Sequence, residues 1–361
     1  MAVYLKEFST HSEYEQYINS SDAILPNVSI CEDTKDAHYN PWVDTRVVAK
    51  FNVTDTSSPT PIGYIKYTSG FSEIEIDGVV QQSVVSAYTF DTIGEHTVKY
   101  TLKNQTSIGY KAFQNCKSLT SIDIPYVVTS IGEDAFYNCS GLTSINIPNG
   151  VTSISNYTFA YCSGLTSIDI PSGVTSIGRY AFRDCNSLTS IDIPNSVTSI
   201  GEDAFDGCSG LTSINIPSGV TSIGGYAFNG CKNLSGSIII PNGVTVINNG
   251  VFKGCSSVTS FTIPNAVTSI GDESFMYCSG FTSIDIPSTV TSIGVGAFQT
   301  CKSLVSVICR PTTPPTGGHS TTFIGNASGR KIYVPADSVN AYKTDSGWWS
   351  FWKDSIEAIT E

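Results

Sequence analysis

A cysteine recurs along the middle of this chain at an almost constant interval, and that interval limits the folds open to the chain. Successive cysteines lie 23 residues apart, except for one gap of 24. A unit of 23 residues is too short for a pair of packed helices, but it is long enough for one turn of a β-solenoid. The cysteines of this column are Cys116, Cys139, Cys162, Cys185, Cys208, Cys231, Cys255, Cys278 and Cys301.

The repeated unit reads L-T-S-I-x-I-P-x-x-V-T-S-I-G-x-x-A-F-x-x-C. In the copy that ends at Cys208, Ile191 and Ile193 alternate with polar residues, as in a strand with one buried face. Pro194 ends this strand, because proline cannot donate to a β-ladder. A second short extended segment follows, and residues 202–207 are expected to form about one helical turn. Each unit therefore predicts one coil, made of a strand and a short helical turn.

Stacking explains how such coils are stabilised. One coil cannot bury its apolar residues alone, whereas stacked coils place each residue over its counterpart about 4.8 Å away. Nine coils are expected, with one extra residue near Ser235 or Gly236 in the long interval. The phenylalanine of each unit is predicted to be core. The cysteines are predicted to be free buried thiols, because they never occur as C-x-x-C and no histidine accompanies them. No metal and no cofactor is expected.

The ends of the chain do not repeat. Residues 45–103 read as four or five strands, which predicts a small Ig-like β-sandwich that also caps the solenoid of residues 104–308. Residues 309–361 are expected to form a C-terminal cap. Its tryptophans, Trp348, Trp349 and Trp352, are interpreted as cap core rather than as a platform for sugars. Residues 1–44 contain few apolar residues and are interpreted as an N-terminal attachment arm.

The repeated unit resembles the BspA-like subclass of leucine-rich repeats over about 208 of the 361 residues. The pattern I-Y-V-P…A-Y-K…W near the C-terminus is similar to the cap of the same family. The resemblance implies a mostly β leucine-rich-repeat solenoid. It also implies adhesion or host recognition rather than catalysis, on the surface of gut and oral anaerobes, their phages or some protists. The opening residues are similar to the N-terminal arms of phage-borne repeat proteins, which implies attachment to a virion.

Charge and hydropathy exclude several classes of partner. The net charge is −12 and there is no basic stripe, so binding to nucleic acid or to an anionic membrane is not expected. No stretch approaches the roughly 18 apolar residues of a membrane span. No secretory signal is recognised at the N-terminus. The resemblance implies a location on the outward face of a virion or cell surface. Because no signal is recognised, that surface would be reached by export within a particle or after synthesis in a host cytoplasm.

Two sets of side chains are the candidate ligand contacts. An outward strand position is occupied by short polar residues, which could hold a cation or a glycan through repeated hydrogen bonds or could simply keep the sheet solvated. Tyrosines in the bend before Phe suit adhesive contacts, although a tyrosine in a bend is also ordinary. The strand set is Asp123, Asn146, Asp169, Asp192, Asn215 and Asp285, and the bend set is Tyr157, Tyr180 and Tyr226.

The leading hypothesis is a non-enzymatic recognition or adhesion protein, which presents a rigid repeat surface to a protein or glycan on a host surface. The alternative is a purely structural virion or surface-layer component that uses the repeat as a spacer. An enzyme is not expected, because the four histidines lie outside the coils and flat rows of aspartate have nothing to raise a carboxyl pKa. A homo-oligomer remains open.

Overall fold

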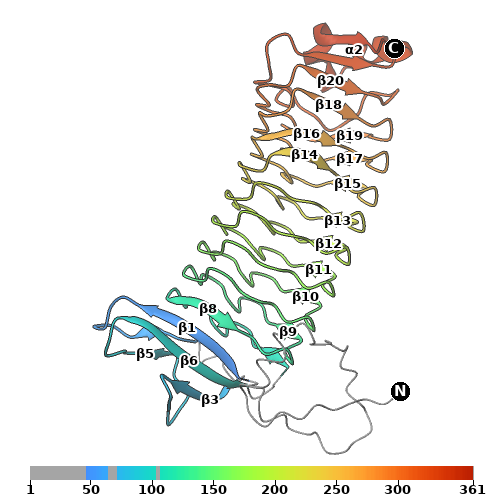
Figure 1. Cartoon of the computed structure of the whole chain (residues 1–361). Helices are drawn as coiled ribbons and strands as arrows, with labels where there is room; N and C mark the ends of the chain where they lie inside the picture. Colours follow the sequence, from blue (N-terminus) through green and yellow to red (C-terminus); the bar gives the residue numbers. More distant parts are fainter. Residues whose placement is uncertain (1–45, 64–70, 103–105, 361) are drawn as a thin grey trace, which may run out of the picture. The chain divides into compact units, whose positions relative to one another are not determined.

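The computed structural model describes residues 46–63, 71–102 and 106–360 (Figure 1). The chain separates into two units, Met1–Thr45 and Arg46–Glu361. The predicted attachment arm at residues 1–44 therefore lies outside the described residues, as does Cys31. Within the described residues, no helix is long and apolar enough to cross a bilayer.

The N-terminal part of the second unit is a five-stranded sheet in the order β4-β3-β6-β1-β8, with a separate β2-β5 pair. This topology does not show the predicted Ig-like sandwich, because the edge strand β8 belongs to the solenoid itself. The strands are β1 (Val47–Val53), β2 (Thr60–Pro61), β3 (Phe71–Ile76), β4 (Val79–Val80), β5 (Ala87–Tyr88), β6 (Gly94–Leu102) and β8 (Leu119–Asp123).

Strand β1 covers the exposed edge of β8, the first strand on the L-T-S-I side of the solenoid. Its sequence VVAKFNV alternates, and its four inward residues, from Val47 to Val53, are fully buried. One edge of β1 pairs antiparallel with β6, and the other pairs antiparallel with β8. The pairing of β1 with β8 therefore joins this sheet directly to the first strand on the L-T-S-I side of the solenoid.

The coils stack in parallel and in register, which confirms the predicted solenoid. Each S-I pair forms a two-residue ladder with the next, as in Ser176↔Ser199 and Ile177↔Ile200. We number the coils 1 to 9 by their cysteines, from Cys116 to Cys301. These short strands are β7 (Ser107–Ile108), β9 (Ser130–Ile131), β10 (Ser153–Ile154), β11 (Ser176–Ile177), β12 (Ser199–Ile200), β13 (Ser222–Ile223), β15 (Val246–Ile247), β17 (Ser269–Ile270) and β19 (Ser292–Ile293).

The L-T-S-I side of the coils carries a second ladder, and this ladder continues past coil 9. Strand β21 pairs parallel with β20, and β22 pairs parallel with β21, so the stack reaches about 11 turns rather than the nine expected. The strands are β14 (Gly236–Ile239), β16 (Val258–Thr262), β18 (Ser283–Ile286), β20 (Ser306–Cys309), β21 (Lys331–Val334) and β22 (Ile356–Ala358).

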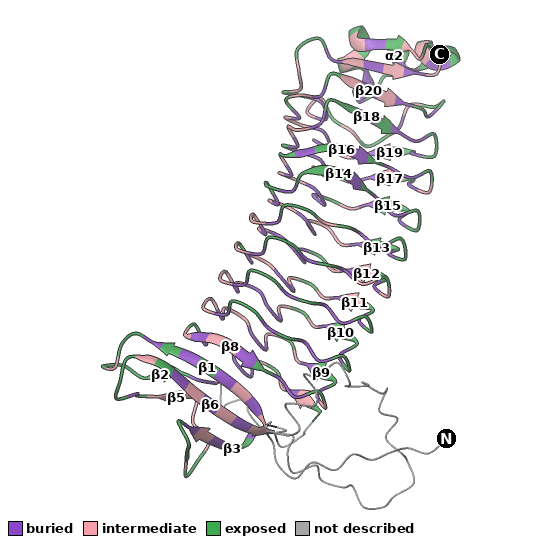
Figure 2. Ribbon diagram, viewed as in Figure 1, coloured by how far each residue is buried: buried purple, intermediate pink, exposed green. Residues whose placement is uncertain are grey.

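The phenylalanine column fills the core, as predicted. Buried and exposed stretches alternate along the ribbon of each coil (Figure 2). From Phe113 to Phe298, neighbouring rings are stacked with their centroids 5.2 to 5.9 Å apart. Phe323 extends the column at 5.5 Å from Phe298, although no cysteine follows it at the repeat position. The core is one continuous cluster from β1 to β22.

The six residues before each column cysteine are here called the turn segment. They do not form the helical turn that the sequence predicted. Alternate amide groups point to different partners. In coil 5, the amides of Asp203, Phe205 and Gly207 donate to carbonyls of coil 6 at 2.8–2.9 Å, whereas those between them donate within their own coil. The first and last of these three residues adopt left-handed φ of 52° and 74°. The left-handed residues interrupt the right-handed dihedrals of a helix and turn every second amide toward the next coil.

The cysteine column is bonded to the phenylalanine column. The Sγ of Cys208 donates to the carbonyl of Phe182 in the preceding coil at 3.0 Å, and the same contact recurs from Cys139 to Cys301. All ten cysteines that the structure describes are free and buried, as predicted. Burial raises the pKa of Cys162 from 9.0 to about 12.

The extra residue of the long interval lies where the sequence indicated. Gly236 adopts φ +79°, and the pairing of β14 with β16 shifts between Gly236 and Ser237. The insertion is thus absorbed as a β-bulge, which glycine accommodates without strain. The next turns return to register at Ser237↔Ser260.

The C-terminal cap covers the last coils. The indole Nε1 groups of Trp348 and Trp349 both donate to the carbonyl of Pro315, at 3.1 and 2.8 Å. Both side chains are buried against Phe323, which confirms their interpretation as cap core; Trp352 is half-buried beside them. The helices of this part are η2 (Ala336–Ser338), α2 (Val339–Thr344) and η3 (Trp348–Ser355).

The buried thiols give a test of the stack. We expect the column cysteines to react with a thiol reagent at least about 1,000-fold more slowly in the native protein than in urea, since a pKa of about 12 instead of 9.0 lowers the thiolate fraction by that factor. Mass spectrometry of labelled peptides would identify the sites. Rapid native labelling of Cys162 or its neighbours would contradict the packing.

His96 gives a second test, in the N-terminal sheet. Burial disfavours the charged ring, but hydrogen bonds to Asp77 (2.7 Å) and to the Thr92 carbonyl (2.9 Å) outweigh it, so the pKa of His96 lies above 6.5. The protonated form therefore stabilises the fold below about pH 6.5, and this contribution is lost as pH rises through the raised pKa. NMR titration should show a lower pKa in Asp77→Asn. An equal pKa in both proteins would refute the assignment.

Candidate functional site

Four residues of the predicted strand set form a continuous exposed row across coils 3 to 6. Isolated parallel bridges link Asn146 to Asp169, Asp169 to Asp192, and Asp192 to Asn215. All four residues are exposed. We call these four residues the polar row.

Threonine hydroxyls beside the polar row form hydrogen bonds between neighbouring coils. Thr166 Oγ1 donates to the Thr143 carbonyl at 3.1 Å, and Thr212 Oγ1 to the Thr189 carbonyl at the same distance. The amides of these threonines donate to the same carbonyls. These paired contacts hold each coil on its neighbour, so the carboxylates and amides of the row project at a fixed repeat.

The other two members of the strand set lie apart from the row. Asp123 ends β8 and is paired with Val48 of β1. Asp285 forms a two-pronged ion pair with Arg310, whose Nε and terminal nitrogen both lie 2.7 Å from its carboxylate oxygens. Between Asn215 and Asp285 the same position carries Ile239, which is 66% exposed, so the polar surface is interrupted there.

The bend tyrosines lie in the turn segments, and two of the three meet. Tyr157 and Tyr180 stack with ring centroids 4.6 Å apart. Tyr137 and Tyr161 join them, with centroids 5.2 Å apart, although the sequence analysis did not select either. Tyr226 stands apart and covers Gly250 of the next coil.

Two arginines complete this cluster and were also missed. The guanidinium groups of Arg179 and Arg183 lie 4.6 and 5.1 Å from the centre of the Tyr180 ring. Arg179 also contacts Glu202 at 3.1 Å, and Arg183 contacts Asp206 at 3.3 Å. The sequence could have indicated them only by their position, because both arginines occupy variable positions of the turn segment.

Three of the four tyrosines are backbone outliers. Tyr157, Tyr161 and Tyr180 have φ of 55°, 63° and 56°, in the left-handed region that bulky residues rarely adopt. Some coils place Asp, Asn or Gly at these two positions, as at Asp203 and Gly250, but others place bulkier residues, as at Lys111 and Tyr226. Strain of this kind costs about 1–2 kcal/mol per residue and gathers at functional surfaces.

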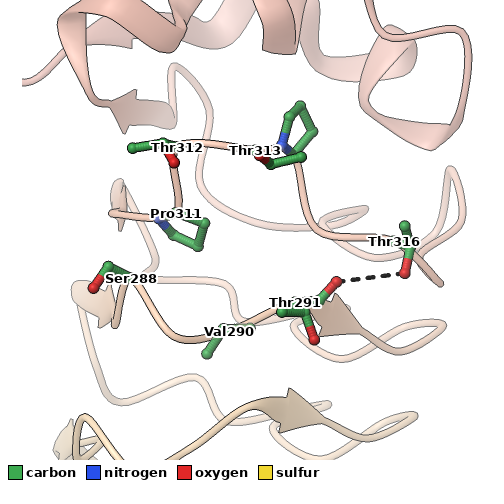
Figure 3. Close-up of a pocket in the computed structure, with 8 residues that line it drawn as sticks. Ser288, Val290, Thr291, Pro311, Thr312, Thr313 and Thr316 are labelled. Carbon is green, nitrogen blue, oxygen red and sulfur yellow. Dashed lines mark hydrogen bonds between the residues drawn. The ribbon is translucent and has the colours of Figure 1, made fainter.

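A shallow pocket of about 420 Å³ lies where the Pro-rich loop meets coil 9 (Figure 3). It offers hydroxyl groups and proline rings, and it contains no titratable side chain. Thr316 Oγ1 bonds the Thr291 carbonyl at 3.4 Å across its rim. No feature of the sequence indicated a pocket in this stretch. The lining residues are Ser288, Val290, Thr291, Pro311, Thr312, Thr313, Pro314 and Thr316.

One arrangement looks like a catalytic triad but cannot act as one. His96 Nδ1 lies 2.7 Å from Asp77, and its Nε2 lies 3.4 Å from the Thr92 hydroxyl. However, the shorter contact of Nε2 is with the Thr92 carbonyl, at 2.9 Å, so this nitrogen donates and has no lone pair for the hydroxyl proton. Within the described ranges, no group of three His, Cys, Asp or Glu side chains could hold a metal ion.

Comparison with known proteins identifies the repeat. A family model described as the BspA type leucine rich repeat region matches residues 83–212 and 199–317, in six copies, which together span more than half of the chain. No curated protein matches the chain.

Solved structures of leucine-rich repeat proteins are also similar. A protein of T. pallidum is 30% identical, with a TM-score of 0.39 over 50% of this chain and 72% of that one. A cell surface protein of Faecalibacterium prausnitzii is 29% identical, with a TM-score of 0.35 over 67% of this chain and 86% of that one. A protein of Bacteroides ovatus is 23% identical, with a TM-score of 0.31 over 81% of this chain and 100% of that one.

The isolated tyrosine gives a test of turn-segment packing. Gly250→Ala should cost about 1–3 kcal/mol, because a methyl group at this left-handed position meets the Tyr226 ring. Adding Tyr226→Asn should recover part of this loss, since Asn tolerates the left-handed backbone and removes the ring. Urea unfolding of both single variants and the double variant measures the coupling. Strictly additive effects would show that the two residues do not touch.

Proposed function

Because the chain belongs to the BspA-type leucine-rich repeat family, we propose that it is a non-enzymatic recognition protein that presents its rigid sheet face to a protein or glycan ligand. The observation that carries this proposal is the unbroken polar row from Asn146 to Asn215. A leucine-rich repeat fold is not typically enzymatic, and the His96 arrangement offers no catalytic base.

The chemistry of the row defines what it binds. Asp169 and Asp192 only accept hydrogen bonds, whereas Asn146 and Asn215 both donate and accept. The four lie on consecutive coils, about 4.8 Å apart. A ligand must therefore bring several donors at a similar repeat, such as sugar hydroxyls or the amide groups of an extended peptide.

Rigidity supports the same proposal. Threonine hydroxyls and amides bind each coil to the one before it, so the row does not have to be ordered when a ligand arrives. Binding then avoids the entropy cost of immobilising the surface, which raises affinity.

Location and attachment are part of the proposal. By the family resemblance, the protein acts on an outward-facing surface of a cell or a virion. Residues 1–44, which lie outside the described residues, attach it to that assembly. The structural alternative, a spacer, requires no ligand for the polar row, so a binding experiment separates the two.

The test compares charge reversals on and off the row. The full-length chain is screened on an array of neutral and acidic glycans and against extracellular-matrix proteins. For any ligand found, Asp169→Lys with Asp192→Lys should weaken binding at least tenfold, because two acceptors are replaced by like-facing donors. The matched control, Asp337→Lys with Asp354→Lys, makes the same change in net charge at exposed sites of the C-terminal cap.

Equal losses in both double variants would assign the effect to net charge and reject the row as the binding site. Absence of binding on every surface would favour the spacer. In that case, deletion of residues 1–44 should still abolish incorporation into a native particle or cell envelope.

A further inference from the structure

The turn segments of coils 1 to 5 carry an ordered pattern of charge. Coil 2 presents Glu133 and Asp134, and coil 4 presents Arg179 and Arg183. Coil 3, between them, presents uncharged residues, among them two tyrosines. Coil 1 carries Lys111, and coil 5 carries an exposed glutamate, Glu202, with two buried aspartates.

Backbone hydrogen bonds hold these segments in register. The amide of Asp134 donates to the Asn156 carbonyl at 3.1 Å, and the amide of Tyr157 donates to the Arg179 carbonyl at 2.9 Å. Corresponding residues of successive coils therefore lie directly above one another. The charge pattern of the sequence becomes a fixed pattern of rows on the surface.

We propose that the turn segments of coils 1 to 5 form a homodimer interface, in which a second copy of this chain packs antiparallel about a two-fold axis that crosses coil 3. Such an axis places coil 1 opposite coil 5 and coil 2 opposite coil 4 of the partner. A two-fold interface must complement itself, and this pattern does.

Each position then meets a suitable partner. Glu133 faces Arg179 of the second copy, because both occupy the same position in coils 2 and 4. Tyr137 faces Arg183 in the same way, which allows a cation–π contact. Lys111 lies opposite the acidic turn segment of coil 5. Every one of these contacts occurs twice.

Coil 3 lies on the axis and meets its own counterpart. Tyr157 and Tyr161 therefore pack against the same two residues of the second copy. Tyrosine and arginine at the centre of a patch, with charged pairs around them, are the usual composition of a protein interface. The coil geometry fixes the left-handed φ of both tyrosines, so their backbone is already ordered before a second copy binds.

The ring arrangement favours a protein over a sugar. One face of Tyr180 is covered by Tyr157 at 4.6 Å, and two guanidinium groups lie over the ring within 5.1 Å. Because the Tyr180 ring is stacked on one side and has guanidinium groups over it, it offers no free face on which a pyranose could stack. The surrounding acidic and basic residues repeat the pattern that a second copy supplies.

Sedimentation velocity of the full-length chain tests the dimer. Between about 1 and 100 µM, the mass should rise from one chain of 38.6 kDa toward two. Arg179→Glu should weaken association at least tenfold, because it sets glutamate against Glu133. Glu133→Lys with Asp134→Lys should do the same, and Lys111 shows that lysine accepts this left-handed position.

The mixture of the two charge variants is decisive. Each contact of the mixed dimer regains opposite charges, so the mixture should associate as the unmodified protein does although neither variant does so alone. Tyr157→Asn should also weaken the dimer at least tenfold, whereas Tyr226→Asn, at the same position of coil 6, should not. Asn suits the left-handed backbone, so both tyrosine variants are expected to fold.

A protein that stays monomeric up to 100 µM overturns the proposal. A dimer that Arg179→Glu and Tyr157→Asn leave unchanged overturns this interface. A mixture of the charge variants that does not associate overturns the antiparallel pairing. Because the polar row is not altered by any of these variants, ligand binding by the sheet face is tested separately.

Discussion

The alternation of amide hydrogen bonds in the turn segment determines how this protein is built. In each coil, every second amide bonds within the coil and the others bond to the next coil. A helix would direct all of these amides inward and leave neighbouring coils unconnected at this side. The alternation keeps the coil spacing constant, and the constant spacing lets the phenylalanine rings stack and each cysteine Sγ reach a phenylalanine carbonyl of the coil before it.

The same alternation decides which residues of the repeat can vary. Two positions in every turn segment are left-handed, and their side chains point away from the core. Some coils relieve the strain with Asp, Asn or Gly, as at Asp203 and Gly207, whereas others accept bulkier residues, as at Lys111. Coils 3 and 4 differ from the rest because their tyrosines, Tyr157 and Tyr180, stack on one another. The repeat therefore distinguishes an ordinary surface from an unusual one, within a frame that is otherwise uniform.

Much of the architecture could be predicted from the spacing of Cys, Phe and Ile, because residues with fixed roles recur at fixed positions. The residue inserted near Gly236 was accessible for the same reason, whereas the tryptophan cap was predicted from its resemblance to the cap of the same family. The additional coil around Phe323 could not be predicted, because it has the phenylalanine of the repeat but not the cysteine. The cluster of Tyr137, Tyr161 and Arg183 was missed because its convergence depends on left-handed dihedrals, which a pattern of letters does not encode. The polar row was found by strand alternation alone.

The two non-repeating ends have a consequence for evolution of the chain. Interior coils bond only to their immediate neighbours, while β1 terminates one end and the tryptophans terminate the other. Duplication or loss of a whole 23-residue unit therefore leaves both terminations intact and changes only the length of the stack. The length of the stack and the number of ligand contacts can therefore change in steps of one coil. A globular protein of changed size would instead need a new arrangement of its core.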